Sequence, residues 1–133
     1  MQPLVLYFSR TGNTNRFAEA ISESAKAPIF SISSCEPSVV ENYDLLIMGT
    51  PVEGASPTKE IMAFTQTLPQ GNGKKTILFC TYRMFGNSRT LKKLGKELTR
   101  NGYEVILNVS KKGMKPDQPA DFSDQLNEIK KTL

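Results

Sequence analysis

The sequence predicts an α/β fold in which one doubly wound parallel sheet of five strands is covered by helices on both faces. Short apolar runs alternate with amphipathic stretches along the chain, as they do when strands and helices alternate. The run at residues 43–50 is apolar on both faces, which is typical of a buried parallel strand. Because the 133 residues contain no linker, repeat or low-complexity tract, we expect one domain, residues 1–133.

The five predicted strands are short runs rich in apolar, β-branched and aromatic residues. They span residues 3–8, 28–33, 43–50, 76–82 and 103–110. Residues 33–43, between the second and third strands, have room for at most one helical turn. The remaining connections are long enough for helices, so the crossovers are expected to be right-handed.

The four predicted helices are recognised by apolar stripes at helical spacing. The first begins at Asn13, and the second follows Ser56, which can cap it. The third is capped by Asn87 or Ser88 and ends at Asn101-Gly102. The stripes consist of Phe17, Ala20 and Ile21, then Ile61, Phe64 and Leu68, then Leu91, Leu94 and Leu98, and finally Phe122, Leu126 and Ile129.

Composition excludes several kinds of chemistry. The chain has no histidine, so Ser-His-Asp and Cys-His catalysis is ruled out. Cys35 and Cys80 lie far apart, and we expect neither a metal site nor a disulfide. No apolar run is long enough to span a membrane and the N-terminus does not resemble a signal peptide, so a cytoplasmic location is expected.

The net charge of +4 is unevenly distributed. Residues 1–73 hold 4 basic and 7 acidic residues, a net −3, whereas residues 74–133 hold 13 basic and 6 acidic residues, a net +7. A solvated basic face is one interpretation, and a docking surface for an acidic partner or an anionic ligand is the other.

The first loop has the residues of a phosphate site. In parallel α/β sheets, ligands bind beyond the carboxyl ends of the strands, which directs attention to loops 9–14, 50–57, 81–88 and 110–119. Loop 9–14 contains three hydroxyls, an amide and Gly12 immediately before a helix N-terminus, a combination that favours an anion. The nucleoside-triphosphate loop, the dinucleotide fingerprint and the small-phosphatase Cys-to-Arg spacing are all absent.

The segment SRTGNT, residues 9–14, resembles the phosphate loop of the flavodoxin family and stands at that family's usual place after the first strand. YDLLIMGTPVEG, from Tyr43, resembles the third strand and first flavin-flanking loop, and TILFCTYRMFGNS, from Thr76, resembles the fourth strand and second loop. The resemblance extends along nearly the whole chain. It implies a flavodoxin-like fold with strand order 2-1-3-4-5.

The resemblance also implies an FMN site made by three loops. The residues carried over to it are Ser9, Arg10, Thr11, Gly12, Asn13 and Thr14 at the phosphate, Thr50, Pro51, Val52, Glu53 and Gly54 on one side of the ring, and Thr81, Tyr82, Arg83, Phe85, Gly86 and Asn87 on the other. Stacking on the flavin is expected from Tyr82 or Phe85. No residue is expected to act as a catalytic group or a metal ligand.

Three features bear on how such a site would work. Members of the family often flip a peptide beside the ring when the flavin is reduced, and we expect this of the Glu53-Gly54 peptide. Arg10 and Arg83 depart from the family's acidic character and would favour an anionic flavin. The buried Cys80 is assigned no redox role.

The resemblance therefore implies an FMN-dependent electron carrier of flavodoxin type that shuttles electrons between soluble redox partner proteins, a reductase and an acceptor. We expect a monomer that binds no nucleic acid and has no membrane span. Two alternatives remain open at this point: an FMN-dependent NAD(P)H:quinone-type reductase and a flavin-free binding module on the same fold. Whether the chain is an enzyme is therefore left undecided, with a non-enzymatic carrier favoured.

Overall fold

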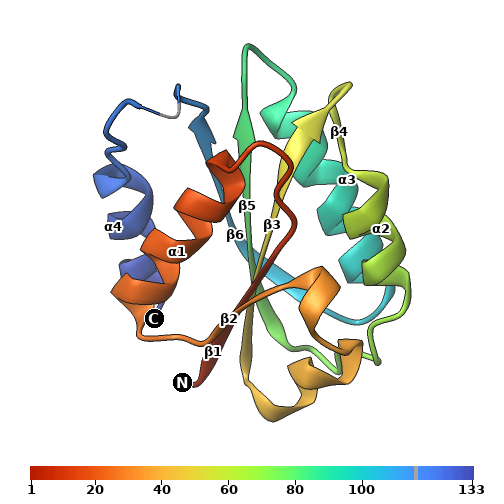
Figure 1. Ribbon diagram of the computed structural model, residues 1–133. Coiled ribbons are helices and arrows are strands. Elements are labelled where there is room, and N and C mark those ends of the chain that lie inside the picture. Colours follow the sequence, from red (N-terminus) through yellow and green to blue (C-terminus); the bar gives the residue numbers. More distant parts are fainter. Residues whose placement is uncertain (116) are drawn as a thin grey trace.

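A parallel sheet runs through the centre of the molecule (Figure 1). The structure is a computed structural model that describes residues 1–115 and 117–133. The sheet has the order β2-β1-β3-β5-β6, which confirms the predicted order 2-1-3-4-5. Its strands are β1 (Pro3–Tyr7), β2 (Ile29–Ser31), β3 (Leu45–Glu53), β5 (Lys75–Tyr82) and β6 (Glu104–Lys112).

Helices cover both faces of the sheet, as the doubly wound pattern predicts. In Figure 1, α1 and α4 lie on one side of the sheet and α2 and α3 on the other. Their bounds are α1 (Asn13–Ala25), α2 (Lys59–Gln66), α3 (Asn87–Arg100) and α4 (Ser123–Thr132). None of the helices formed by the described residues is long and apolar enough to cross a membrane.

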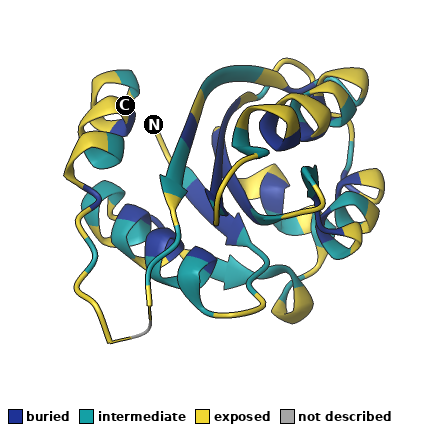
Figure 2. Cartoon of the chain, turned by 90° about the horizontal axis from the view of Figure 1, so that it is seen from above, coloured by how far each residue is buried: buried dark blue, intermediate teal, exposed yellow. Residues whose placement is uncertain are grey.

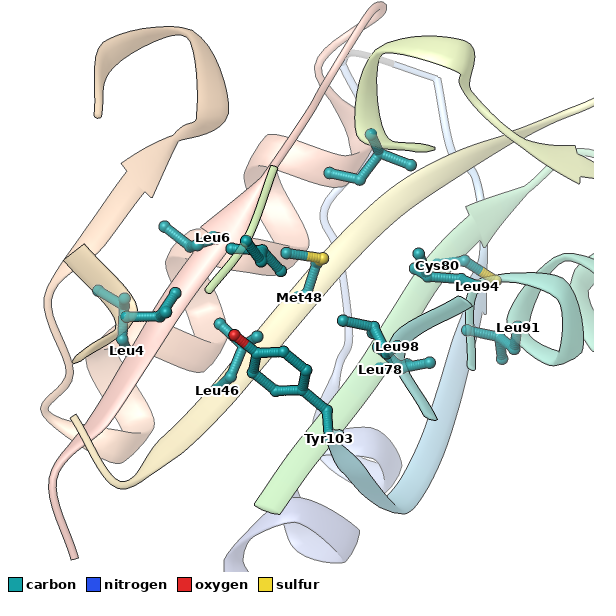
Figure 3. Packing of buried hydrophobic residues seen from close by; sticks show 13 residues of the cluster. Leu4, Leu6, Leu46, Met48, Leu78, Cys80, Leu91, Leu94, Leu98 and Tyr103 are labelled. Carbon is teal, nitrogen blue, oxygen red and sulfur yellow. The ribbon is translucent and has the colours of Figure 1, made fainter. Parts of the chain in front are cut away.

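Alternate residues of each strand form two separate cores. On the α2/α3 side, Leu4, Leu46 and Leu78 pack in neighbouring strands (Figure 3). On the α1/α4 side, Ile47 and Ile77 pack against the two helices. Burial of both strand faces explains why the strands appear as continuous apolar runs in the sequence. Figure 2 shows that exposed residues are concentrated on the outer sides of the helices.

Three phenylalanines connect the sheet to α1 and α4. The ring of Phe17 packs edge-on to that of Phe79, with centroids 5.1 Å apart, and stacks on that of Phe122 at 4.9 Å. Gly49 makes room for this arrangement, because a Cβ at that position would be 2.1 Å from the Phe79 ring.

A short hairpin after β3 changes the predicted start of the second helix. Ser56 and Pro57 form strand β4, which pairs antiparallel with the end of β3. The helix cap is therefore Thr58, whose hydroxyl accepts a hydrogen bond from the Ile61 N–H at 3.2 Å, and the predicted Ser56 cap is wrong.

The predicted cap of the third helix is also wrong. Gly86, with φ of 95°, occupies the cap position of α3, and Asn87 and Ser88 already lie within the helix. The left-handed backbone is readily adopted by glycine, which explains the choice of residue.

Two 3-10 helices replace an α-helix between β2 and β3. They span Ile32–Ser34 and Pro37–Asn42, and Val40 fills the core at 1% exposure. The Lys74 ammonium donates hydrogen bonds to the carbonyls of Val40 and Tyr43, which fastens this segment to the start of β5. The expectation of at most one helical turn between residues 33 and 43 is wrong, because Pro37–Asn42 alone is long enough for two 3-10 turns.

Candidate functional site

A cleft opens at the edge where the carboxyl ends of β1, β3, β5 and β6 meet. Its volume is about 260 Å³. It is lined by Arg10, Thr11 and Asn13 after β1, by Pro51, Val52 and Glu53 at the end of β3, by Thr81, Tyr82 and Arg83 at the end of β5, and by Gly113 after β6. The structure thus brings together residues from the three loops of the FMN site that the resemblance implies, and Gly113 from loop 110–119.

The first loop turns directly into the N-terminus of α1. Gly12 has φ of 101°, and a Cβ there would meet nothing within 4 Å, so the requirement for glycine is conformational. The Ser9 hydroxyl accepts hydrogen bonds from the N–H groups of Gly12 (3.1 Å) and Asn15 (3.2 Å). The positive end of the helix dipole points at this loop, which favours a negative ligand there.

Thr14 supports the loop from inside the fold. Its hydroxyl lies 2.7 Å from the Thr81 hydroxyl, and both side chains are buried. This bond joins the first turn of α1 to the end of β5. Thr14 does not line the cleft. Its hydrogen bond to Thr81 instead fixes the loop after β1 relative to the loop after β5.

Thr50 and Asn87 also act as supports. The Thr50 hydroxyl donates to the Pro51 carbonyl at 2.8 Å and accepts from the Thr58 N–H at 3.2 Å. The Asn87 amide donates to the Ser110 hydroxyl at 2.9 Å, which links α3 to β6. Neither side chain lines the cleft.

Arg10 is held by two carboxylates. Its Nε donates to Glu53, and its Nη2 lies 3.1 Å from Glu53 Oε1 and 2.9 Å from Glu60 Oε1. The guanidinium also lies over the Phe8 ring at 5.0 Å. These bonds connect the first loop with the β3–β4 hairpin and with α2.

This ion-pair group changes the expected electrostatics of the cleft. Hydrogen bonds to Glu53 and Glu60 raise the pKa of the Arg10 guanidinium, and the hydrogen bond to Arg10 lowers the pKa of Glu60. One cation and two carboxylates carry a net charge of −1. The charge of Arg10 is therefore neutralised by Glu53 and Glu60, which removes the physical basis for expecting Arg10 to favour an anionic flavin. Arg83 also lines the cleft, and it has no acidic partner among the described residues.

The β3–β4 hairpin has a two-residue turn with unusual backbone angles. Gly54 and Ala55 have φ of 58° and 59°, and both values are left-handed, as a type I′ turn requires. A Cβ on Gly54 would meet nothing within 4 Å. The Glu53-Gly54 peptide therefore lies at the tip of the hairpin, and its expected flip on flavin reduction stays a prediction.

The loop after β5 packs against this hairpin. A Cβ on Gly86 would lie 2.9 Å from the Ala55 Cα and 3.1 Å from a Val52 methyl carbon, so glycine permits the close approach. Of the two aromatic candidates for stacking, half-buried Tyr82 lines the cleft. Phe85 does not line it and is 74% exposed.

Gly113 was not selected from the sequence. Its N–H donates to the Tyr82 carbonyl at 2.6 Å, and a Cβ at this position would be 2.8 Å from the Asn13 amide nitrogen. The sequence did contain a signal for Gly113, because this glycine lies in loop 110–119, one of the four loops expected at the carboxyl ends of the strands. A glycine there lets the β6 loop approach the first loop closely.

A larger hollow of about 520 Å³ adjoins the cleft. It shares Thr11, Asn13, Arg83 and Gly113 with the cleft and adds Met84, Lys112, Met114 and Lys115. The volume of the hollow lies within the range found at small-molecule sites, roughly 300 to 1,000 Å³, and the volume of the cleft lies slightly below it.

Comparison with known proteins identifies the family. Residues 4–113 match the flavodoxin domain family. The chain belongs to the flavodoxin family. An uncharacterized protein of Methanocaldococcus jannaschii is 32% identical over 108 residues, which cover 80% of this chain and 71% of that protein.

Solved structures agree with a flavodoxin fold. Oxidised Flavodoxin 2 from Bacillus cereus superposes with a TM-score of 0.82 at 18% identity, covering 100% of both chains. A flavoprotein from Lactobacillus acidophilus, solved in complex with FMN, gives a TM-score of 0.67 at 17% identity and covers 82% of this chain and 92% of that one. Within the flavodoxin fold, the cleft lies at the switch point between β1 and β3, where ligands of doubly wound sheets bind.

Cys80 lies outside this chemistry. Its side chain is buried and burial raises the pKa of its thiol to about 12. The thiol therefore stays protonated near neutral pH and is a poor nucleophile.

Proposed function

We propose that this flavodoxin-family chain binds FMN and carries electrons between soluble redox enzymes. The observation that carries the proposal is the convergence of three loops on one cleft: a helix N-terminus with hydroxyl and amide groups, and two loops that flank it. FMN supplies the redox chemistry when bound, because no group of this chain is redox-active at ordinary potentials apart from two thiols.

The first loop suits the phosphate of FMN. Thr11 and Asn13 line the cleft and offer a hydroxyl and an amide. The first N–H groups of a helix have no acceptor within the helix, and they would donate to phosphate oxygens. The Ser9 hydroxyl accepts hydrogen bonds from the N–H of Gly12 in this loop and from the N–H of Asn15 in the first turn of α1, so it holds the loop in its turned conformation.

The other two loops suit a flat ring system. Tyr82 would stack on one face of the isoalloxazine ring, and Pro51 and Val52 would cover the other with apolar surface. The Lactobacillus acidophilus protein, solved in complex with FMN, supports the choice of cofactor. A monomeric state, a cytoplasmic location, and a reductase and an acceptor as protein partners remain predictions from the sequence.

The first test is titration of the purified protein with FMN, followed by stepwise anaerobic reduction. We expect flavin fluorescence to be quenched at micromolar FMN and the reduction to pass through a one-electron stage. Absence of binding would contradict the proposal. Rapid bleaching by NADPH with no partner present would favour the reductase alternative instead.

A matched pair of glycine variants tests whether the first loop holds the phosphate. Gly12 and Gly73 both have left-handed backbones, φ 101° and 81°, and both have open space where a Cβ would be placed. We expect either change to alanine to lower the free energy of unfolding by about 1 kcal/mol. Only Gly12→Ala should weaken FMN binding, by about tenfold or more, because only Gly12 belongs to the first loop. Equal FMN affinities of the two variants would argue against a phosphate site there.

A further inference from the structure

The loop after β5 presents an exposed apolar pair, which we call the apolar tip: Met84 and Phe85. These side chains are 82% and 74% exposed, more than any other large hydrophobic residue of the described chain; the next are the terminal Met1 and Leu133. Single exposed apolar residues are ordinary, but two adjacent large ones beside a ligand cleft indicate a contact surface.

Cations lie beside Met84 of this tip. Arg83, Lys112 and Lys115 line the hollow together with Met84 and Met114, and no acidic residue lines it within the described chain. None of the three cations has an acidic partner among the described residues. The hollow is therefore positively charged around an apolar, deformable lining of two thioether side chains.

Helix α3 extends the positive charge away from the same end of the sheet. It begins at Asn87, directly after the tip, and carries Arg89, Lys92, Lys93 and Lys96, all of them exposed. Its single acidic residue, Glu97, is paired with Arg100. Residues 83–115 hold nine basic and two acidic residues, a net +7, and the remainder of the chain holds eight basic and eleven acidic residues, a net −3.

We propose that this face, made of the apolar tip with Arg83, Lys112 and Lys115, docks an acidic partner protein that inserts an apolar side chain between the cations. The proposal rests on the proposed electron-carrier function and adds the chemistry of the partner. An apolar centre within a charged rim is the usual composition of a transient protein interface. Complementary charge orients the two proteins and speeds their encounter. The face adjoins the cleft through Arg83 and Gly113, so a docked partner lies next to the cofactor position.

Other polyanions fit the face less well. Duplex DNA offers phosphates to the cations but few aliphatic groups to Met84 and Met114. A lipid bilayer is flat and does not enter the hollow beside the tip. An acidic protein supplies carboxylates and a protruding apolar side chain together.

The test uses a short synthetic peptide of glutamates around a central Leu-Phe pair, carrying a fluorescent label. Its anisotropy is measured against the full chain, with and without FMN, at low and at physiological salt. A second peptide has Ser-Ser in place of Leu-Phe and the same charge. Amide chemical shifts of ¹⁵N-labelled protein locate the binding site.

Three variants separate charge from apolar contact. Lys112→Glu with Lys115→Glu should weaken binding of the Leu-Phe peptide about tenfold. Met84→Ser with Phe85→Ser should weaken it about fivefold, and should not change binding of the Ser-Ser peptide. The control, Lys130→Glu with Lys131→Glu, makes the same change in net charge at the end of α4 and should alter binding less than about twofold.

The proposal is overturned if the Lys130/Lys131 control weakens peptide binding as much as the Lys112/Lys115 variant does. It is also overturned if the amide chemical-shift changes caused by the peptide are spread evenly over all the basic residues of the chain. Tighter binding of a DNA duplex or of anionic phosphatidylserine vesicles at physiological salt would overturn it as well. FMN titration of the unaltered protein is a separate result: failure to bind FMN with intact peptide binding contradicts the proposed function only. FMN binding without specific peptide binding contradicts the docking face only.

Discussion

Ala55 shows how a single residue stores strain beside the candidate site. Its φ of 59° is left-handed, in a turn where glycine is preferred at both central positions. We expect Ala55→Gly to raise the free energy of unfolding by about 1 kcal/mol, because a Cβ is disfavoured at this angle. The comparison is Ala63→Gly, the same chemical change at an exposed position of α2, which should lower stability by about 1 kcal/mol. Urea denaturation measures both, and a destabilised Ala55→Gly variant would contradict the argument.

Arg10 shows what the sequence conveys about a residue and what it omits. The pattern Ser-Arg-Thr-Gly-Asn-Thr places it correctly in the first loop. Its partners Glu53 and Glu60 follow 43 and 50 residues later, and no local periodicity links such distant positions. The neutralisation of Arg10 therefore required the fold to be known.

The same ion-pair group predicts a pH dependence. Arg10 lowers the folded-state pKa of Glu60 below its usual 4.5. A depressed carboxylate pKa contributes stability above the unfolded pKa, and this contribution is lost as the pH falls through the folded pKa. We expect Arg10→Gln to reduce the urea midpoint near pH 7 and to have little effect near pH 3. Both partners are largely solvated, so the change should be small. If the urea midpoints of the unaltered protein and Arg10→Gln differ by the same amount at every pH, the ion pair between Arg10 and Glu60 does not contribute as described.

At the scale of elements, regular periodicity was the reliable signal. The four helices and five main strands follow from apolar spacing. Their order in the sheet was implied by the resemblance to the flavodoxin family and is confirmed by the structure. The hairpin β4 was missed because Ser56 and Pro57 alone have no periodicity. The 3-10 turns between β2 and β3 are held by Lys74, which bonds to carbonyls more than 30 residues away, and such support is invisible in a local window.

The phenylalanine contacts between elements predict a large stability effect. Phe17 is fully buried. Its ring packs against that of Phe79 in β5 and against that of Phe122, which directly precedes α4. We expect Phe17→Ala to lower the free energy of unfolding by about 3 to 5 kcal/mol, since it removes both ring contacts and leaves a cavity. Phe85→Ala is the matched change at an exposed position and should cost less than about 0.5 kcal/mol in the FMN-free protein. Chemical denaturation of both variants under the same conditions measures the two effects. Similar losses of unfolding free energy in Phe17→Ala and Phe85→Ala would contradict the ring contacts described for Phe17.

At the scale of the whole molecule, two opposing charges act at the cleft. The group of Arg10, Glu53 and Glu60 carries −1. The cation Arg83 lines the same cleft as Arg10 and Glu53, and Lys112 and Lys115 line the adjoining hollow. Reduction of a bound flavin to an anionic form adds negative charge, which the three cations stabilise and the carboxylates oppose. Three cations without an acidic partner among the described residues outweigh a net charge of −1, so we expect the cations to dominate.

The sign of the salt dependence shows which side dominates. Salt shortens the range of charge interactions to about 10 Å at 0.1 M, so added salt should weaken the stabilisation by the cations. If FMN binds, we expect its two-electron midpoint potential to become more negative as salt rises from low to high concentration. Lys112→Glu with Lys115→Glu should flatten or invert this slope. Lys130→Glu with Lys131→Glu should leave it nearly unchanged, because those residues belong to the last turn of α4, near the C-terminus, and line neither the cleft nor the hollow. A potential of the unaltered protein that rises with salt would mean that Glu53 and Glu60 control the field at the cleft.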